Sequence, residues 1–372
     1  MRKLVCMYPL RRRATRKNPR HVRHHTNWIR PRTCATVGIV LTATLISGCG
    51  GAEEMPQSTP LPHFQSGFEA GTEVRSLQPE GNCTADIVGL DTSVPSRGHW
   101  ETDLEASPVG LARVCFAGGT SEQRGVELIE ESDGNRALRM WLREPGENIS
   151  DDDVACNDDP VGARKARAQH ALTNLDDVTH AIYRARVRLG DTFQLLEDDV
   201  DQAETITWMT LGEYWNEQAP ATGETKGDRA RVTLTLLKKM EETGDRRFHL
   251  AVASELQPAS QPSGWDSQLP GEYGIILDDP VPIGEWFTLE VNLRASDGPD
   301  DTPGGVTLSM EYDGRVTSGG FEGDTIVPGG AVPGFTTLHL LKLYTAGGYV
   351  CALRDQGGLE VFWDDLQVWL DP

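Results

Sequence analysis

The stretch "EWFTLEVNLRA", residues 285–295, decides the fold class, because hydrophobic and polar residues alternate along it. Successive side chains of a strand point to opposite faces, so this stretch would have one apolar face and one polar face. The pattern predicts a half-buried strand of an antiparallel sheet, with a core on one side and solvent on the other. The apolar face consists of Phe287, Leu289, Val291 and Leu293, and the polar face of Trp286, Thr288, Glu290, Asn292 and Arg294.

Nine further segments are similarly rich in strand-forming residues and mostly keep the period of two. Glycine, proline, aspartate and asparagine fill the gaps, and no long amphipathic helix interrupts the series. Ten such strands predict an all-β fold in which two antiparallel sheets pack as a jelly-roll sandwich. The nine segments are residues 137–142, 163–172, 180–189, 205–215, 231–240, 248–256, 305–314, 337–345 and 359–370.

The first 48 residues have the composition of an export signal rather than of a folded domain. Residues 1–33 contain eleven Lys or Arg and no acidic residue, and an apolar run over residues 34–46 ends before small residues. A basic segment, a short apolar segment and small residues before the cleavage point are typical of a signal peptide. The apolar run is too short for a permanent membrane-spanning helix. We therefore expect residues 1–48 to be removed.

The sequence "LISGCG", residues 45–50, resembles the lipobox of bacterial lipoproteins. The resemblance implies that Cys49 is lipidated and anchors the mature protein on a membrane that the chain does not cross. Because Gly50 follows it, the resemblance also implies the outer membrane, with the domain facing the periplasm or the cell surface. An ordinary signal peptide with a chance cysteine is the alternative. The small, polar, proline-containing residues 49–63 predict a tether, followed by a single domain over residues 64–372.

Acidic residues dominate the 372-residue chain, whose formal net charge is −21 at pH 7. Loss of residues 1–48 would leave all 56 Asp and Glu against 24 of the 35 Lys and Arg. This charge argues against nucleic acid as a partner and against broad electrostatic capture of anionic polymers. We expect a monomer in which the charge provides solubility.

Four cysteines remain after the predicted signal peptide and lipidation site: Cys83, Cys115, Cys156 and Cys351. An even number in an exported protein predicts two disulfides, which can pair in three ways. Of these we favour Cys83–Cys115 with Cys156–Cys351. A zinc site is disfavoured, because no C-x-x-C pair or histidine cluster accompanies these cysteines.

Seven motifs in order along the chain resemble a group of secreted bacterial and fungal proteins with a concanavalin-A-like jelly roll, related to polysaccharide lyases and laminarin-binding domains. The resemblance covers nearly all of residues 67–370. It implies a concanavalin-A-like lectin and glucanase type of sandwich and a carbohydrate setting, without a particular reaction. The motifs are "GLDTSV" (89–94), "CFAGGTSEQRGVELIEES" (115–132), "KARAQ" (165–169), "ITWMTLGEYWNE" (206–217), "VPIGEWFTLE" (281–290), "LLKLYT" (340–345) and "LEVFWDDLQVW" (359–369).

The "KARAQ" segment supplies three candidate site residues. Alternation places Lys165, Arg167 and Gln169 on one strand face and two alanines on the core side. Arg and Gln side chains can bind the hydroxyls and carboxylates of a sugar. The family resemblance implies polar residues where Arg167 and Gln169 stand, and a solvated strand face is the alternative.

The segment "LGEYWNEQA", residues 211–219, supplies a candidate platform on which a pyranose ring could stack. Trp215 would provide the apolar surface, and Glu213 and Asn216 would accept hydrogen bonds from sugar hydroxyls. Core packing is the alternative for Trp215, and we expect Trp208 to fill the core.

Glu213 and Glu217 are poor candidates for a glycosidase pair. Laminarinase-like jelly rolls have an E-x-D-x-E strand, whereas the middle residue here is tryptophan. Residues four apart on a flat strand are about 13 Å apart, and the carboxyls of a retaining glycosidase are about 5 Å apart. Hydrolysis by this pair is therefore disfavoured.

A polysaccharide lyase is the main catalytic hypothesis. It needs a group that neutralises the uronate carboxylate, a base for the C5 proton and an acid for the leaving oxygen. Arg167 and Gln169 could neutralise, Tyr344 could transfer protons, and His249 or His170 could be the base. Alginate-lyase-like jelly rolls have Gln-x-His, whereas His170 directly follows Gln169 and therefore faces the other way. The catalytic groove would be centred on Arg167, Gln169, Lys238 and Tyr344. In this groove Lys238 would bind the ligand.

A structural calcium ion is predicted where the expected first and last strands meet, at residues 66–72 and 362–367. Many carbohydrate-binding sandwiches share a calcium ion at this place. Glu69, Asp364 and Asp365 offer the oxygen ligands that calcium prefers. Hydrogen bonding without a metal is the alternative.

The sequence thus favours a lipid-anchored envelope protein that binds polysaccharide on the concave face of a jelly roll. A lyase that cleaves a uronate-containing glycan by β-elimination is the first alternative. A structural envelope lipoprotein without a ligand is the second.

Overall fold

A computed structural model provides the structure of the protein. It describes residues 60–80, 82–117, 120–144, 165–198, 205–218, 227–239, 243–259, 265–267, 274–296, 303–325 and 334–371. These residues belong to one compact unit, Ser58–Pro372. The predicted signal peptide and the predicted lipidation site, Cys49, lie outside the described residues.

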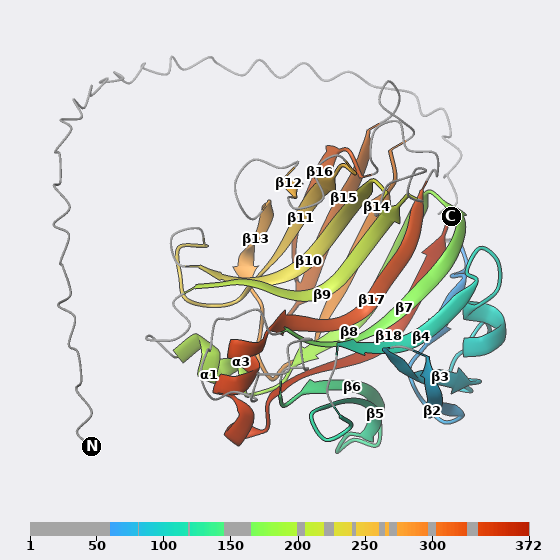
Figure 1. Ribbon diagram of the computed structural model, residues 1–372. Coiled ribbons are helices and arrows are strands. Elements are labelled where there is room, and N and C mark those ends of the chain that lie inside the picture. The colour runs from blue at the N-terminus through green and yellow to red at the C-terminus, as the bar shows by residue number, and fades with distance from the viewer. Residues whose placement is uncertain are drawn as a thin grey trace, which may run out of the picture. The chain divides into compact units, whose positions relative to one another are not determined.

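Within the described chain, one antiparallel sheet has eight strands (Figure 1). Strand β1 (Phe64–Ser66) pairs with the central strand β18, so the two ends of the domain lie side by side. The other seven strands follow the order β16 (Arg315–Gly323), β15 (Gly304–Tyr312), β14 (Phe287–Arg294), β8 (His180–Leu189), β18 (Leu359–Leu370), β6 (Arg136–Leu142) and β5 (Arg124–Glu130).

The second sheet has ten strands in the described residues. Strand β13 (Ile275–Pro280) pairs with β11 off the main path. The other strands follow the order β12 (Asp266–Ser267), β11 (His249–Gln257), β10 (Arg229–Lys239), β9 (Thr205–Glu217), β17 (Phe335–Ala346), β7 (Lys165–Val178), β4 (Leu111–Ala117), β3 (Cys83–Gly89) and β2 (Thr72–Glu80).

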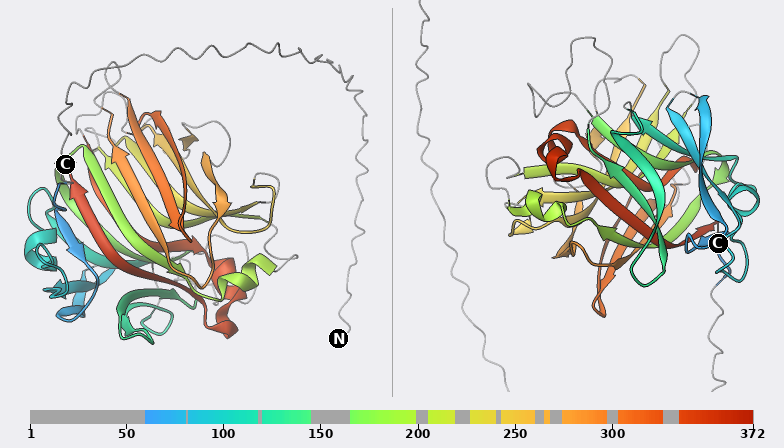
Figure 2. Two further views of the ribbon diagram at one scale, coloured as in Figure 1. Left: turned by 180° about the vertical axis from the view of Figure 1, so that it is seen from behind. Right: turned by 90° about the horizontal axis from the view of Figure 1, so that it is seen from below.

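The two sheets pack face to face around one large hydrophobic core (Figure 2). Strand β14 shows how the sequence determines this packing, since Phe287, Leu289, Val291 and Leu293 are all buried, as their alternation predicts. Tyr183 of β8 and Tyr214 of β9 connect the sheets through hydroxyls 2.5 Å apart. The fold is an all-β, two-sheet antiparallel jelly-roll sandwich, which confirms the prediction.

Short helices lie at the margins of the sheets. Helix α1 (Phe193–Asp198) and helix α3 (Gly347–Ala352) both lie at the same end of the sandwich (Figures 1 and 2). The described residues also contain a π-helical turn, Trp100–Leu104, and a 3₁₀ turn, Arg354–Gln356. No helix among the described residues is long and apolar enough to span a membrane.

Each of the ten predicted strands overlaps an observed strand, and the segment 180–189 matches β8 at both ends. The segment 66–72 was expected to be a strand, but most of it forms the turn between β1 and β2. Its glycines explain the difference, because Gly71 adopts φ +97°, a conformation that other residues rarely take.

The predicted disulfide Cys83–Cys115 is confirmed, and it joins the neighbouring strands β3 and β4. Cys156 lies outside the described residues, so its pairing with Cys351 stays a prediction.

Candidate functional site

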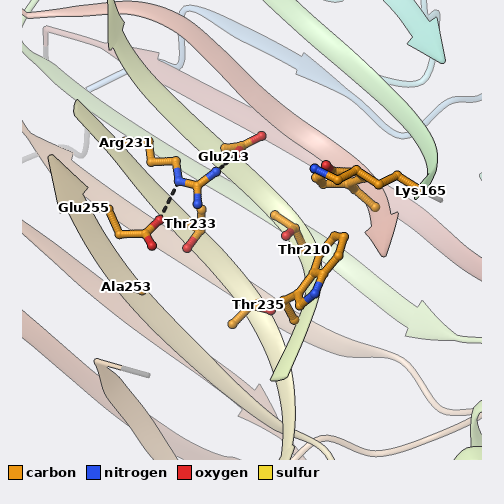
Figure 3. Close-up of a pocket in the computed structure, with 10 residues that line it drawn as sticks. Lys165, Thr210, Glu213, Arg231, Thr233, Thr235, Ala253 and Glu255 are labelled. Carbon is orange, nitrogen blue, oxygen red and sulfur yellow. Dashed lines mark hydrogen bonds and ion pairs between the residues drawn. The ribbon is translucent and has the colours of Figure 1, made fainter. Parts of the chain in front are cut away.

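The outer face of the ten-stranded sheet contains a groove with a cavity volume of about 380 Å³ (Figure 3). Its side chains come from strands β7, β17, β9, β10 and β11. The strand positions between them, such as Leu234 and Leu236 of β10, point into the core. The groove is lined by Lys165, Trp208, Thr210, Glu213, Arg231, Thr233, Thr235, Ala253, Glu255 and Tyr344.

A β-bulge in β9 determines which of its side chains reach the groove. Gly212 pairs with Leu234 of β10, and Thr210 pairs with the next residue, Thr235, so Leu211 is an extra residue. An extra residue shifts the alternation of the strand by one position. Trp208 before the bulge and Glu213 after it therefore share the outer face. The expectation that Trp208 fills the core is wrong, because it lines the groove and is only half-buried.

A second bulge in β17 adds a histidine that the sequence interpretation did not single out. His339 pairs with Ala171 of β7, and Leu341 pairs with His170, so Leu340 is the extra residue. His339 and Lys342 consequently lie on the same outer face although they are three positions apart. A strict period of two would have placed them on opposite faces.

Glu213 is the centre of an ionic cluster below the groove. Its carboxylate binds the ammonium of Lys342, whose side chain is fully buried. Arg231 Nη1 lies 3.5 Å from Glu213 Oε1, and His339 Nδ1 lies 3.8 Å from Glu213 Oε2. Burial lowers the pKa of Lys342 to about 8, although the negative charge of Glu213 opposes the shift. Burial therefore brings the pKa of Lys342 closer to neutral pH than that of an exposed lysine.

Gln169 and His339 are joined across β7 and β17. The amide nitrogen Nε2 of Gln169 donates to Nε2 of His339 over 3.1 Å. Burial, and then the positive charges of Lys342 and Arg167, lower the pKa of His339 well below its ordinary value. The imidazole is thus neutral at neutral pH, with its second nitrogen directed toward Glu213.

Three buried polar atoms beside the groove have no hydrogen-bond partner: Arg167 Nε, Gln169 Oε1 and His339 Nδ1. An unpaired buried polar group costs about 1–3 kcal/mol, so such groups are uncommon in folded proteins. The three residues occupy adjacent positions on β7 and β17. Their arrangement is what a site for a polar ligand requires.

Aromatic rings lie at both ends of the outer face of β9. Trp208 and Tyr344 are in edge contact at 5.0 Å between ring centroids. Trp215 and Trp265 are in edge contact at 5.6 Å, and the guanidinium of Arg231 lies 4.2 Å from the Trp265 ring. Trp265 could not be found from sequence periodicity, because it immediately precedes a strand of only two residues, β12.

The structure brings together five of the predicted site residues and separates others from them. Lys165, Glu213 and Tyr344 line the groove, and Arg167 and Gln169 adjoin it on β7. Arg167 Cζ lies 5.8 Å from the centroid of the Tyr344 ring. Trp215 is half-buried at the far end of the outer face, 5.7 Å from the guanidinium of Arg231.

Asn216 was predicted to bind ligand and does not reach the groove. It is fully buried, and its amide donates to the carbonyl of Gly334 over 2.5 Å and accepts from Gln218 over 2.6 Å. The strand alternation explains this placement, because Asn216 lies between the outward-facing Trp215 and Glu217. Glu217 is exposed and forms an ion pair with Arg229 at 3.2 Å.

Lys238 was also predicted to lie in the groove, and this placement is wrong. Its side chain is buried, and Nζ donates to the carbonyls of Leu196 and Glu197 in helix α1. A positive charge at the carbonyl end of a helix is stabilising. Lys238 therefore holds α1 against the sheet.

Neither predicted histidine base lies in the groove. His249 has both ring nitrogens engaged, Nδ1 with the Leu277 carbonyl at 2.9 Å and Nε2 with Asp245 at 3.1 Å. His170 points into the core against Trp100, as the alternation predicts, and both of its ring nitrogens lack a partner. Burial, with a contribution from Arg113, lowers the pKa of His170 to about 3. His339 is the histidine that the fold presents beside the groove.

The predicted calcium ligands have other partners in this structure. Glu69 accepts from the backbone of Arg136 at 3.0 Å. Asp364 accepts from Asn135 at 2.9 Å and lies 3.3 Å from Arg186, and Asp365 is largely exposed. Among the residues that the structure describes, no three His, Cys, Asp or Glu side chains are grouped so that they could hold a metal ion. Calcium binding stays a prediction.

No protein-family model and no curated protein sequence matches the chain. Among solved structures it is similar to the PL-14 alginate lyase of Aplysia kurodai, with 11% identity, TM-score 0.36, and coverage of 66% of this chain and 87% of that one. It is also similar to the alginate lyase vAL-1 from Chlorella virus, with 10% identity, TM-score 0.37, and coverage of 66% and 89%. A protein of unknown function from Shewanella oneidensis MR-1 has 7% identity, TM-score 0.30, and coverage of 68% and 78%.

These similarities are too weak to assign an activity, and the fold rests on the strands of this chain. The fold and the groove together define a class: a jelly-roll sandwich with a polar, aromatic-edged groove on one outer sheet face.

Proposed function

We propose that the outer face of the ten-stranded sheet binds a polysaccharide chain. One observation supports this most strongly: Arg167, Gln169 and His339 each have a buried polar atom without a partner, next to a groove edged by aromatic rings. Sugars present hydroxyls and carboxylates that pair with such atoms, and apolar ring faces that stack on tryptophan. A glycan would satisfy both parts of the site at once.

A glycan array probed with the purified domain, residues 58–372, tests this proposal. We expect binding to at least one polysaccharide, a loss of that signal in Trp208→Ala, and no change in Arg184→Ala. Arg184 is the matched control because it lies on the other sheet. Absence of all glycan binding would refute the proposal and favour a structural envelope protein.

Cleavage by β-elimination is the second candidate function, and the Gln169–His339 contact favours it. Arg167 and Gln169 would neutralise a uronate carboxylate, and His339 would take the proton from C5 at Nε2, the nitrogen that is freed when the Gln169 amide turns from His339 to the carboxylate. The C4–oxygen bond would then break, leaving a double bond between C4 and C5, and Tyr344 would protonate the departing oxygen.

Ultraviolet absorbance of the unsaturated uronate product distinguishes cleavage from binding. The lyase hypothesis predicts absorbance that grows with time on a bound uronate polymer and is lost in His339→Ala and in Tyr344→Phe. Binding without any growth in absorbance would contradict the lyase hypothesis and leave the binding proposal intact.

We also propose that the domain is held at the outer membrane by a lipid on Cys49. The basic, apolar and small-residue segments that precede Cys49 support this. Metabolic labelling with a fatty acid in a bacterial host should mark the wild-type protein and not Cys49→Ala. Equal labelling of both proteins, or of neither, would contradict the anchor.

A further inference from the structure

Two pairs of aromatic residues border the groove and differ in their surroundings. The first platform consists of Trp208 and Tyr344, and both rings line the groove and are half-buried. The second platform consists of Trp215 and Trp265, also half-buried, which enclose the guanidinium of Arg231. Each platform keeps part of its ring surface accessible, so each can receive the apolar face of a sugar ring.

The two platforms are too far apart for one small sugar. Trp208 and Trp215 belong to the same strand, and seven residues at about 3.3 Å per residue, shortened by the bulge, separate them by roughly 20 Å. A disaccharide is shorter than this separation. The surface between the platforms is polar and is lined by Thr210, Glu213 and Thr233.

The platforms also differ in charge. Lys165 Nζ lies 5.9 Å from the Trp208 ring centroid, Arg167 Cζ lies 5.8 Å from that of Tyr344, and neither cation has a carboxylate partner in the described residues. Arg231 at the second platform is neutralised twice, by Glu255 at 2.5 Å and by Glu213 at 3.5 Å. An acidic sugar therefore fits the first platform better than the second.

We infer that the groove binds a linear acidic polysaccharide along β9, with an acidic residue at the first platform and a sugar stacked on the second. This inference rests on the proposed function. It adds a minimum length for the bound polysaccharide and places the acidic sugar at the first platform. The bound segment must reach from one platform to the other, because each of its ends has a platform.

Calorimetric titration with oligosaccharides from disaccharide to octasaccharide, prepared from the polysaccharide that the array identifies, tests the inference. For the wild type, affinity should rise by roughly ten-fold once the oligosaccharide is long enough to reach both platforms. Trp265→Ala should abolish this step while leaving the affinity for short oligosaccharides unchanged. Trp265→Phe retains an aromatic ring and should keep the step, which separates loss of stacking from loss of folding.

The charge assignment is tested with the same oligosaccharides after reduction of their carboxyl groups. Reduction should weaken binding to the wild type by at least ten-fold and have a smaller effect on Arg167→Ala. Equal affinity for all chain lengths, or equal binding of reduced and unreduced chains, would overturn the inference while the proposed function stands. Absence of binding to every polysaccharide would instead refute the proposed function itself.

Discussion

The two outer faces of the sandwich both present basic side chains, but these side chains differ in whether they have carboxylate partners. On the eight-stranded sheet, Arg184 lies 3.6 Å from Glu311, Arg186 lies 3.3 Å from Asp364, and Arg188 binds Glu131. On the ten-stranded sheet, Lys165 and Arg167 have aromatic neighbours and, in the described residues, no carboxylate partner. Nε of Arg188 is also unpaired, but its terminal nitrogen is neutralised.

The difference supports the proposal that one face is a scaffold and the other a binding site. A cation that is already paired with a carboxylate of the protein binds a ligand weakly. An unpaired cation near apolar rings favours an anionic ligand. In a chain with formal net charge −21, acids are abundant, so unpaired cations on one face stand out. The predictions below compare the two faces directly.

The largest effect is expected from Glu213→Ala. This change leaves the buried ammonium of Lys342 without its carboxylate, and breaking a buried ion pair from one side costs about 3–5 kcal/mol. Urea unfolding of the purified domain measures the free energy. Glu311→Ala on the opposite face is the control, and an equal effect of the two changes would contradict the buried cluster.

Acid sensitivity should come from His170. Its folded pKa of about 3 lies below the ordinary 6.5, so between these values the unfolded chain holds a proton that the folded chain lacks. Stability is therefore complete above pH 6.5 and falls as the pH drops, by roughly 2 kcal/mol between pH 6.5 and pH 5. The free energy of unfolding of His170→Leu, measured at several pH values, should fall less steeply in acid than that of the wild type.

Asp364, on the other sheet, provides a control of opposite sign. Burial raises its pKa to about 6, so between 3.8 and 6 the folded state holds the extra proton. Asp364→Asn should therefore steepen the loss of stability in acid, and identical pH profiles for both variants would contradict the assignment.

Arg167→Ala should weaken polysaccharide binding by at least ten-fold, or about 1.4 kcal/mol, because it removes an unpaired cation beside the groove. Calorimetric titration measures the affinity. An unchanged affinity would show that the outer face of β7 is not part of the site.

The smallest effect is expected from Arg184→Ala. The ion pair between Arg184 and Glu311 is exposed, and such pairs contribute about 0–1 kcal/mol. Both the unfolding free energy and the affinity for polysaccharide should remain within that range of the wild type.

The sandwich could be predicted from sequence because regular alternation governs most strands. Every apolar position of the segment 285–295 that was assigned to the core is buried in β14. The same rule placed Lys165, Arg167 and Gln169 on the outer face of β7, next to the groove.

The rule failed where bulges shift it. The extra residue Leu211 puts Trp208 in the groove, although Trp208 was expected in the core. The extra residue Leu340 puts His339 beside the groove, and the sequence interpretation did not single out His339. Pairs of consecutive non-polar residues, Leu211-Gly212 and Leu340-Leu341, mark both bulges and were the available signal. The alternation of β10 puts Lys238 on the same side as the core residues Leu234 and Leu236, and its prediction as a groove residue overlooked this. The partners of its ammonium could not be predicted from the strand, because they lie in a helix about forty residues earlier.

Affinity electrophoresis tests the central claim, that polysaccharide binds the outer face of the ten-stranded sheet. Wild type, Arg184→Ala and the double variant Arg167→Ala/Trp208→Ala would be run through native gels that each contain one polysaccharide identified on the array. We predict that the polysaccharide retards the wild type and Arg184→Ala and leaves the double variant unretarded. Equal retardation of all three, or retardation lost only in Arg184→Ala, would contradict the claim.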